Sequence, residues 1–148
     1  MISKAANCLH RIALRLAYPI LSRLERALGI CSNVALVAVW HGDKLLLIRH
    51  SYKLGGGLPG GTLRVGEPPV NAAARELYEE VGISASPDQL ILLRSWKQKE
   101  GDRWLFEYRP PSMPRIVPDQ REVVAAQFVA RHELPNSIRV ILGNNSER

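Results

Sequence analysis

The sequence predicts one α/β domain in which a mixed β-sheet is covered by helices. Three observations lead to this fold class. Short apolar segments rich in β-branched residues recur along the chain, and turn residues separate them. An amphipathic helix interrupts these segments near the middle of the chain. The 148 residues, 46% of them hydrophobic, suffice for one domain with a core and are too few for two substantial domains.

Residues 9–28 predict an amphipathic helix that precedes the sheet. Apolar residues recur at helical spacing on one side and arginines on the other, namely Leu9, Leu16, Ile20, Leu24 and Leu28 against Arg11, Arg15, Arg23 and Arg26. Pro19 is expected to split or kink this helix, because proline lacks the N–H and clashes with the preceding turn. Residues 1–30 hold five basic side chains and one acidic one, so most of the net charge of +6 lies here.

The place of this basic helix stays open between three interpretations. We expect it to pack on the domain or on a second subunit of a homodimer, while peripheral contact with a membrane and organellar targeting are the alternatives. The recurring arginines predict neither a transmembrane helix nor a signal peptide. Cys8 and Cys31 form no metal or disulfide pattern and fit a reducing compartment, so we expect a cytoplasmic protein.

The strands are predicted from continuous apolar runs or from alternation about turns. They are expected at Val34 to Trp40, Leu45 to Ile48, Gln89 to Lys97, Trp104 to Tyr108 and Val123 to Val129. Turns at residues 41–43 and 100–102 make the first two and the next two strands antiparallel pairs. Residues 51–61 contain five glycines and a proline and are expected to form a loop. A short helical tail is expected from Asn136.

The central helix is predicted from Pro68 to Val81. Two prolines at 68 and 69 suit a helix start, and Gly82 is placed to end it. One face is apolar and is expected to be buried; it consists of Val70, Ala73, Ala74, Leu77 and Val81.

Three glutamates at positions 76, 79 and 80 stand at i, i+3 and i+4 of this helix, so their carboxylates are expected to converge on one patch. Like charges at close range are costly without a cation between them, and oxygen ligands suit Mg²⁺ or Mn²⁺. Arg75 could orient or partly neutralise the cluster. On the glutamates alone, a solvated acidic face is the more ordinary interpretation.

The residues around the glutamates favour a metal site over a solvated acidic face. Gly61 is followed after five residues by Glu67, and after seven more by the segment Arg75-Glu76-Leu77-Tyr78-Glu79-Glu80-Val81-Gly82-Ile83. This spacing resembles, without a gap, the Nudix signature G-x5-E-x7-R-E-U-x-E-E-x-G-U, where U is aliphatic. The resemblance extends over about residues 32–136. It implies the Nudix fold, an α/β/α sandwich, in residues 31–148, with residues 1–30 as a separate helical segment.

The resemblance also implies an activity, a cofactor and a set of site residues. Nudix hydrolases use Mg²⁺ or Mn²⁺ to direct water onto a phosphorus of a nucleoside diphosphate linked to another group. By position in the signature, the metal ligands would be Glu76, Glu79, Glu80 and the carbonyl of Gly61. Glu122, before the last strand, is the candidate for a further acid that often joins from a later loop. The candidate catalytic residues are therefore Arg75, Glu76, Glu79 and Glu122, with Glu76 as first choice for the general base.

Other positions are assigned supporting roles. Gly60, Glu67 and Gly82 would maintain the geometry of the loop and helix. Arg49 and Arg64 could contact an anionic substrate, although a solvated arginine is an equal interpretation for Arg49. The four histidines form no metal motif and are expected in turns, on the surface or in packing.

The substrate is not specified by the sequence beyond a small-molecule nucleotide. Markers of the ADP-ribose and dinucleoside-polyphosphate subfamilies are absent from residues 99–101. A catalytically silent nucleotide sensor and an RNA 5′-end pyrophosphohydrolase are the alternatives. The sensor is disfavoured because the signature glutamates are all present, and binding to nucleic acid is disfavoured because most of the basic excess lies in residues 1–30.

Overall fold

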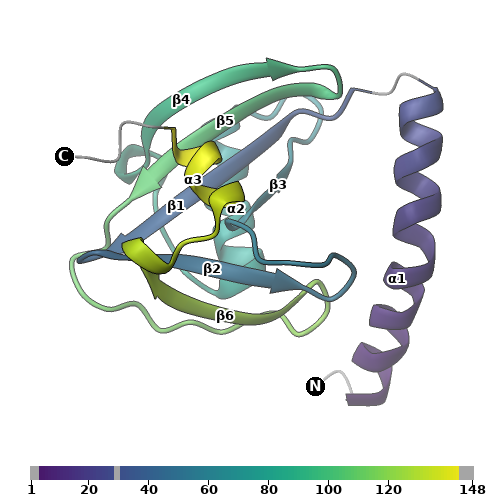
Figure 1. The fold of residues 1–148 in the computed structure, drawn as a ribbon, viewed down its shortest axis with the longest axis horizontal. Helices are drawn as coiled ribbons and strands as arrows, with labels where there is room; N and C mark the ends of the chain where they lie inside the picture. Colours follow the sequence, from purple (N-terminus) through teal and green to yellow (C-terminus); the bar gives the residue numbers. More distant parts are fainter. Residues whose placement is uncertain (1–3, 29–30, 144–148) are drawn as a thin grey trace.

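The computed structural model describes residues 4–28 and 31–143, which contain one mixed sheet of six strands with helices on both of its faces (Figure 1). The elements, in chain order, are α1 (Lys4–Ala27), β1 (Val34–His41), β2 (Lys44–His50), β3 (Gly60–Thr62), α2 (Pro69–Val81), the 3₁₀ helix η1 (Pro87–Gln89), β4 (Ile91–Gln98), β5 (Gly101–Tyr108), β6 (Val123–Ala130), the 3₁₀ helix η2 (Arg131–Glu133) and α3 (Asn136–Leu142).

The strand order is β4-β5-β1-β2-β6, with the short β3 paired to the first half of β1. β1 and β5 run parallel, from Val34 opposite Arg103 to Val39 opposite Tyr108, and the other pairs are antiparallel. In Figure 1, α2 lies behind this sheet and α3 in front of it. The predicted α/β/α sandwich with a mixed sheet is therefore confirmed.

Two hydrophobic clusters fill the space on the two faces of the sheet. Alternate residues of β1 and β2 belong to different clusters, because successive side chains of a strand point to opposite faces. The apolar stripe of α2, with Leu77 and Val81 fully buried, packs on one face. α3 closes the other face through the buried Ile138. α2 is thus held rigidly, and the side chains on its remaining face are positioned by this packing.

Most predicted elements are present, and two expectations were wrong. β3 lies inside the stretch expected to be a loop, because its residues Gly60 and Gly61 carry no side-chain pattern that could indicate a strand. The N-terminal helix begins at Lys4 rather than at residue 9 and continues through Pro19, so it is not split there. The helical tail expected from Asn136 is α3.

α1 stands beside the domain and contacts it with its polar side (Figure 1). Contact with the domain is one of the two placements expected for this helix, but its apolar side does not take part, because Leu9, Leu16 and Ile20 are each at least 65% exposed. Among residues 4–28 and 31–143, no helix has the length and the apolar character needed to cross a membrane.

β4 forms one edge of the sheet and exposes the apolar side chains of Ile91, Leu92 and Leu93. Its register with β5 shifts between Leu92 and Arg94, so one extra residue is inserted in this strand. Such a bulge bends the strand and increases its twist locally.

We predict that Leu77→Ala lowers the free energy of unfolding by about 2–5 kcal/mol, because it removes a fully buried side chain between α2 and the sheet. Urea denaturation followed by circular dichroism measures this change. The adjacent exposed residue supplies the control, since Tyr78→Ala should change the same free energy by about 0.5 kcal/mol or less. Equal losses in both variants would contradict the packing described for α2.

Candidate active site

The glycine pair that forms β3 lies directly against the acidic face of α2. The N–H of Gly60 donates a hydrogen bond to Oε2 of Glu80 at 2.8 Å. Gly60 has φ 145°, and a Cβ there would collide with the carbonyl oxygen of Ala35. A Cβ on Gly61 would lie 2.5 to 2.8 Å from the three carboxyl atoms of Glu76. Glycine at both positions therefore allows the β3 backbone to approach the two glutamates.

Glu80 is buried, with 5% of its surface exposed. Burial is the main cause that raises the pKa of Glu80 to about 8, and the negative charges of Glu76, Glu122 and Asp119 raise it further against the hydrogen bond from Gly60. The same combination raises the pKa of Glu76, where burial outweighs the contact with Arg75. Burial next to other carboxylates therefore disfavours the charged forms of both Glu80 and Glu76.

His50 lies beside Glu80 at the end of β2. Its Nδ1 is 3.9 Å from Oε1 of Glu80, but burial, together with the charge of Lys53, lowers the pKa of His50 to about 4. The imidazole is therefore neutral at pH 7, and the two groups do not form an ion pair. Within the described part of the chain, the buried Nδ1 has no hydrogen-bond partner. An unpartnered buried polar atom beside these carboxyl groups is a position where a further polar group or ion would find a hydrogen-bond partner.

Arg75 is the cation that most of the carboxylates share. Its Nη1 donates to Oε1 of Glu76 at 2.7 Å and to Oε2 of Glu79 at 3.0 Å. Nε and Nη2 each donate to one carboxylate oxygen of Glu67 at 2.9 Å. Hydrogen bonds from Arg75 and from the N–H of Arg64 lower the pKa of Glu67 to about 2. Arg75 thereby ties the loop that leads into α2 to the two more exposed glutamates.

The loop before β6 brings Glu122 to the same end of the sheet. One carboxylate oxygen of Asp119 accepts hydrogen bonds from the N–H groups of Arg121, Glu122 and Val123 at 2.8 to 3.1 Å. The N–H of Asp119 in turn donates to the carbonyl of Glu80 at the end of α2. Asp119 therefore determines where Glu122 stands relative to the helix, close enough for its charge to raise the pKa values of Glu76 and Glu80.

The glutamates are near one another but do not form a ready ligand set. In residues 4–28 and 31–143, no three or more His, Cys, Asp or Glu side chains form a group that could hold a metal ion as they stand. The reason is visible in their contacts, since Glu76 and Glu79 bind Arg75 while Glu80 binds Gly60. Their assignment as metal ligands stays a prediction.

The donors nevertheless fit a hard divalent cation by their chemistry. They are carboxyl oxygens, of which those of Glu76 and Glu80 have raised pKa values, beside a backbone so close that a Cβ on Gly61 would collide with Glu76. Binding of an ion would require Glu76 to exchange its contact with Arg75 for the metal.

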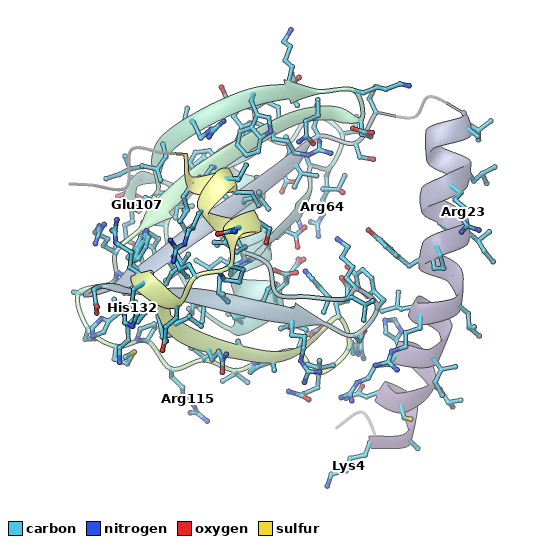
Figure 2. The ribbon with its side chains drawn as sticks, in the orientation of Figure 1. Lys4, Arg23, Arg64, Glu107, Arg115 and His132 are labelled. Carbon is cyan, nitrogen blue, oxygen red and sulfur yellow. The ribbon has the colours of Figure 1, made fainter. Side chains whose placement is uncertain are left out.

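The structure places the other predicted site residues in different ways. Gly82 has φ 71° and ends α2 as predicted, with its N–H bonded to the carbonyl of Tyr78. Arg64, which is labelled in Figure 2, lies near the glutamates. Its Nη2 donates to Oε1 of Glu79 at 3.2 Å, so one of its N–H groups is already used. Arg49 is not brought together with them, because it alternates with His50 and points to the other face of the sheet, where it lines a cavity of about 470 Å³.

Sequence reasoning missed His50, Tyr52 and Asp119. Burial and the charges of Glu122 and Glu80 raise the pKa of Tyr52, so its ring also lies at this site. These residues follow β2 or precede β6 and reach the glutamates only through the fold. The sole available signal was the segment Arg49-His50-Ser51-Tyr52 at the end of the predicted hairpin.

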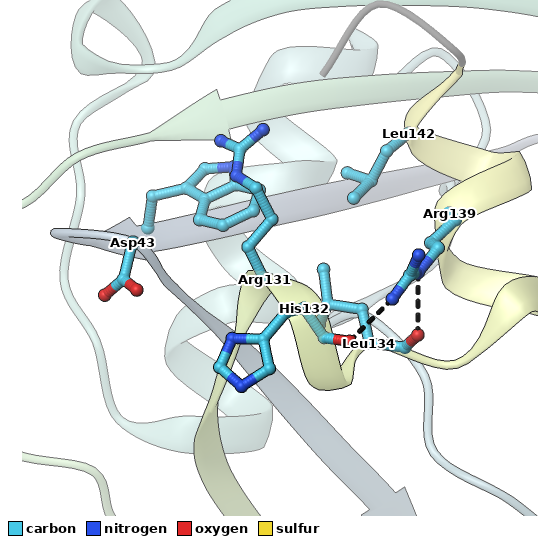
Figure 3. Close-up of a pocket in the computed structure, with 7 residues that line it drawn as sticks. Asp43, Arg131, His132, Leu134, Arg139 and Leu142 are labelled. Atoms are coloured by element: carbon cyan, nitrogen blue, oxygen red, sulfur yellow. Dashed lines mark hydrogen bonds between the residues drawn. The ribbon is translucent and has the colours of Figure 1, made fainter. Parts of the chain in front are cut away.

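A second cavity, of about 410 Å³, lies near the opposite end of β1 (Figure 3). The guanidinium group of Arg131 stacks on Trp40 at 4.5 Å, and Arg139 donates to the carbonyls of His132 and Leu134. Figure 2 shows His132 on the side of the molecule away from Arg64. These contacts connect α3 to the sheet, and the cavity is separate from the glutamates of α2.

Comparison with known proteins finds the same family along most of the chain. A family model described as "NUDIX domain" matches residues 31–144. Phosphatase NudJ from Escherichia coli is 30% identical over 108 residues, which cover 69% of this chain and 71% of the relative.

Solved structures are similar in fold. A MutT NUDIX hydrolase from Burkholderia pseudomallei matches with a TM-score of 0.65 and 22% identity, over 75% of this chain and 95% of the other. A bifunctional NMN adenylyltransferase/ADP ribose pyrophosphatase from Francisella tularensis, complexed with AMP and a Mn ion, matches with a TM-score of 0.55 and 22% identity over 76% of this chain. The chain spans only 44% and 36% of two of the structures that it matches.

We predict that Asp119→Ala lowers the free energy of unfolding by about 1–3 kcal/mol, because three backbone N–H groups lose their acceptor. Urea denaturation measures the loss. Asp119→Asn keeps one carbonyl oxygen as acceptor and should retain most of the stability. If the alanine variant were as stable as the wild type, the turn that carries Glu122 would not depend on this carboxylate.

Proposed function

The chain belongs to the Nudix family of hydrolases, which act on phosphorus-containing anhydrides, and from this premise we propose that it is a Mg²⁺-dependent enzyme that cleaves a nucleoside diphosphate linked to another group. The observation that carries the proposal is that an unbroken signature, residues 61–83, folds so that the β3 glycines lie directly against Glu76 and Glu80. The similar Francisella protein is complexed with a Mn ion and AMP, which supports a divalent ion and a nucleotide as the ligands of this site.

The residues that would hold the ion are Glu76, Glu79, Glu80 and Glu122, with the carbonyl of Gly61. When bound, a divalent cation would stabilise the negative charge that develops on the bridging oxygen of the substrate. Oxygen ligands favour Mg²⁺, and Mn²⁺ is the alternative.

The side chains of this chain would position and deprotonate the attacking water. The water oxygen forms a bond to phosphorus, the bond from that phosphorus to the bridging oxygen breaks, and the phosphate product leaves with the electron pair. Glu76, half-buried beside the Gly61 backbone, would accept the proton of the water. Arg75 contacts both Glu76 and Glu79 and would restrict their orientations.

Arg64 would contact the anionic substrate next to the glutamates, and Arg49 would contact a part of it that reaches the other face of the sheet. Arg64 is 66% exposed next to Glu79, so it can reach a phosphate outside the carboxylate cluster. Arg49 lines the cavity between β2 and β6 together with Gln127 and Glu133. A substrate that extends around the end of β2 would meet both arginines.

We predict that Glu76→Gln lowers kcat by roughly 10²-fold or more while the fold is retained, because it removes a charged ligand and a proton acceptor. Turnover is measured with Mg²⁺ and again after chelation and readdition of the ion. Glu107→Gln is the matched control, since Glu107 also binds an arginine, Arg109, but lies away from Arg64 in Figure 2. A protein indifferent to chelation would refute the metal dependence.

Binding of the ion has a readout that is independent of turnover. We expect Mg²⁺ to raise the Tm of the wild type, because a ligand that binds only the native state stabilises it. The increase should be smaller in Glu79→Gln, which lacks one of the proposed ligands. An equal increase in both proteins would remove Glu79 from the ligand set.

The substrate class is tested with a panel of nucleotide sugars, dinucleotides, ADP-ribose, nucleoside triphosphates and RNA with a 5′-triphosphate. We expect a nucleoside monophosphate as product, whereas release of inorganic phosphate would indicate the kind of activity named in phosphatase NudJ. Binding of nucleotides without cleavage of any of them would identify a sensor. Retention on RNA that falls steeply with salt would favour the RNA-end activity.

A further inference from the structure

The outer side of α1 is an apolar surface that no other element of the described chain covers. At about 100° per residue, five large side chains fall within an arc of about 120°; they are Leu9, Ile12, Leu16, Ile20 and Leu24, between 50% and 69% exposed. The other residues of this arc are alanines at positions 5, 6, 13 and 27 and a single charged residue, Arg23. We call these residues the outer arc. A surface helix of a globular protein normally turns such a stripe toward the core.

The polar side of α1 is the side that holds the domain. Nε of Arg11 donates to the carbonyl of Gln120 at 2.8 Å, and Nε of Arg15 donates to the carbonyl of Ser51 at 2.6 Å. The ring of Tyr18 packs on Tyr52 with centroids 4.7 Å apart. α1 cannot rotate its outer arc onto the sheet without breaking these contacts. The outer arc is therefore directed away from the domain, as the exposure of its large side chains also indicates.

We propose that the outer arc docks on an anionic lipid surface, with α1 lying in the plane of the interface. The charge of this segment supports that partner, since residues 1–30 carry five basic side chains and one acid. Arg23 lies within the outer arc and is exposed, and Lys4 is exposed at the N-terminal end of α1. Arg11 and Arg15 instead face the domain. An apolar face combined with Lys and Arg is the composition that binds membrane interfaces rich in acidic headgroups.

A second copy of the chain fits this surface less well. Pairing of two helices uses a narrow seam flanked by opposite charges, as in coiled coils. The outer arc is wider than such a seam, and the one charge within it, Arg23, has no acid in the arc to pair with. Two copies of α1 would therefore bring like charges together. A planar interface accommodates the full width, and Arg23 can extend its charged end to the headgroups.

The arrangement also keeps the domain in water. Since the outer arc and the domain lie on opposite sides of α1, docking would leave the sheet and the glutamates of α2 outside the lipid. The contacts of Arg11 and Arg15 would hold the domain next to the surface through the loops at Ser51 and Gln120. The inference concerns location and does not depend on the proposed hydrolysis.

The test is flotation of the full chain with vesicles of phosphatidylcholine, with and without a minority of phosphatidylserine. We expect binding only to the anionic vesicles, and a decrease at high salt because surface charges are screened. The double variant Leu16→Glu, Ile20→Glu should bind at least about tenfold more weakly, because two apolar side chains of the outer arc become acidic. Hydrolysis in solution should be unchanged in this variant.

Val140→Glu is the matched control, because Val140 is 72% exposed on another helix, α3. Its vesicle binding should equal that of the wild type. The proposal is overturned if the chain remains unbound with anionic vesicles, or if the double variant and Val140→Glu bind equally. A dimer in light scattering that the double variant abolishes, without vesicle binding, would show that a second copy covers the outer arc instead.

Discussion

The close approach between the β3 backbone and the acidic face of α2 is the constraint on which the site depends. Gly60 and Gly61 permit this approach because neither position has room for a Cβ. The approach buries Glu80 and places the carboxylate of Glu76 against backbone, where charge is poorly solvated. Packing of Leu77 and Val81 on the sheet maintains this arrangement from the opposite side of the helix. The packing of the apolar core thus determines how strongly burial disfavours the charged forms of Glu76 and Glu80.

Arg75 compensates part of the negative charge of these carboxylates from within the chain. It contacts three carboxylates at once, so the removal of any one of them leaves a guanidinium that still has partners. Within residues 4–28 and 31–143, Glu80 has no such contact with arginine and accepts a hydrogen bond from one backbone N–H. Among the charged forms of Glu76, Glu79 and Glu80, that of Glu80 is therefore the least compensated, and an added cation would have its largest effect there.

The parts of the structure that depend on local pattern could be predicted. The stripe of α2, its end at Gly82 and the spacing of its glutamates follow from helical periodicity. His50 and Asp119 could not be predicted, because they meet Glu80 across separations of some thirty or more residues that only the strand order closes. The orientation of α1 was also missed, since periodicity identifies an apolar side but does not say what it faces. The amphipathic pattern was correct, and the expected contact with the domain is made by the polar side of the helix.

The bulged edge strand β4 has a consequence for how this protein behaves at high concentration. An edge strand with three exposed apolar residues is a template onto which another chain can add a strand and begin to aggregate. The extra residue between Leu92 and Arg94 interrupts the regular ladder that such addition requires. The exposed cations Arg94 and Lys97 further along β4 oppose the approach of an identical edge through charge repulsion. Together, the bulge and these two cations oppose aggregation through this edge of the sheet.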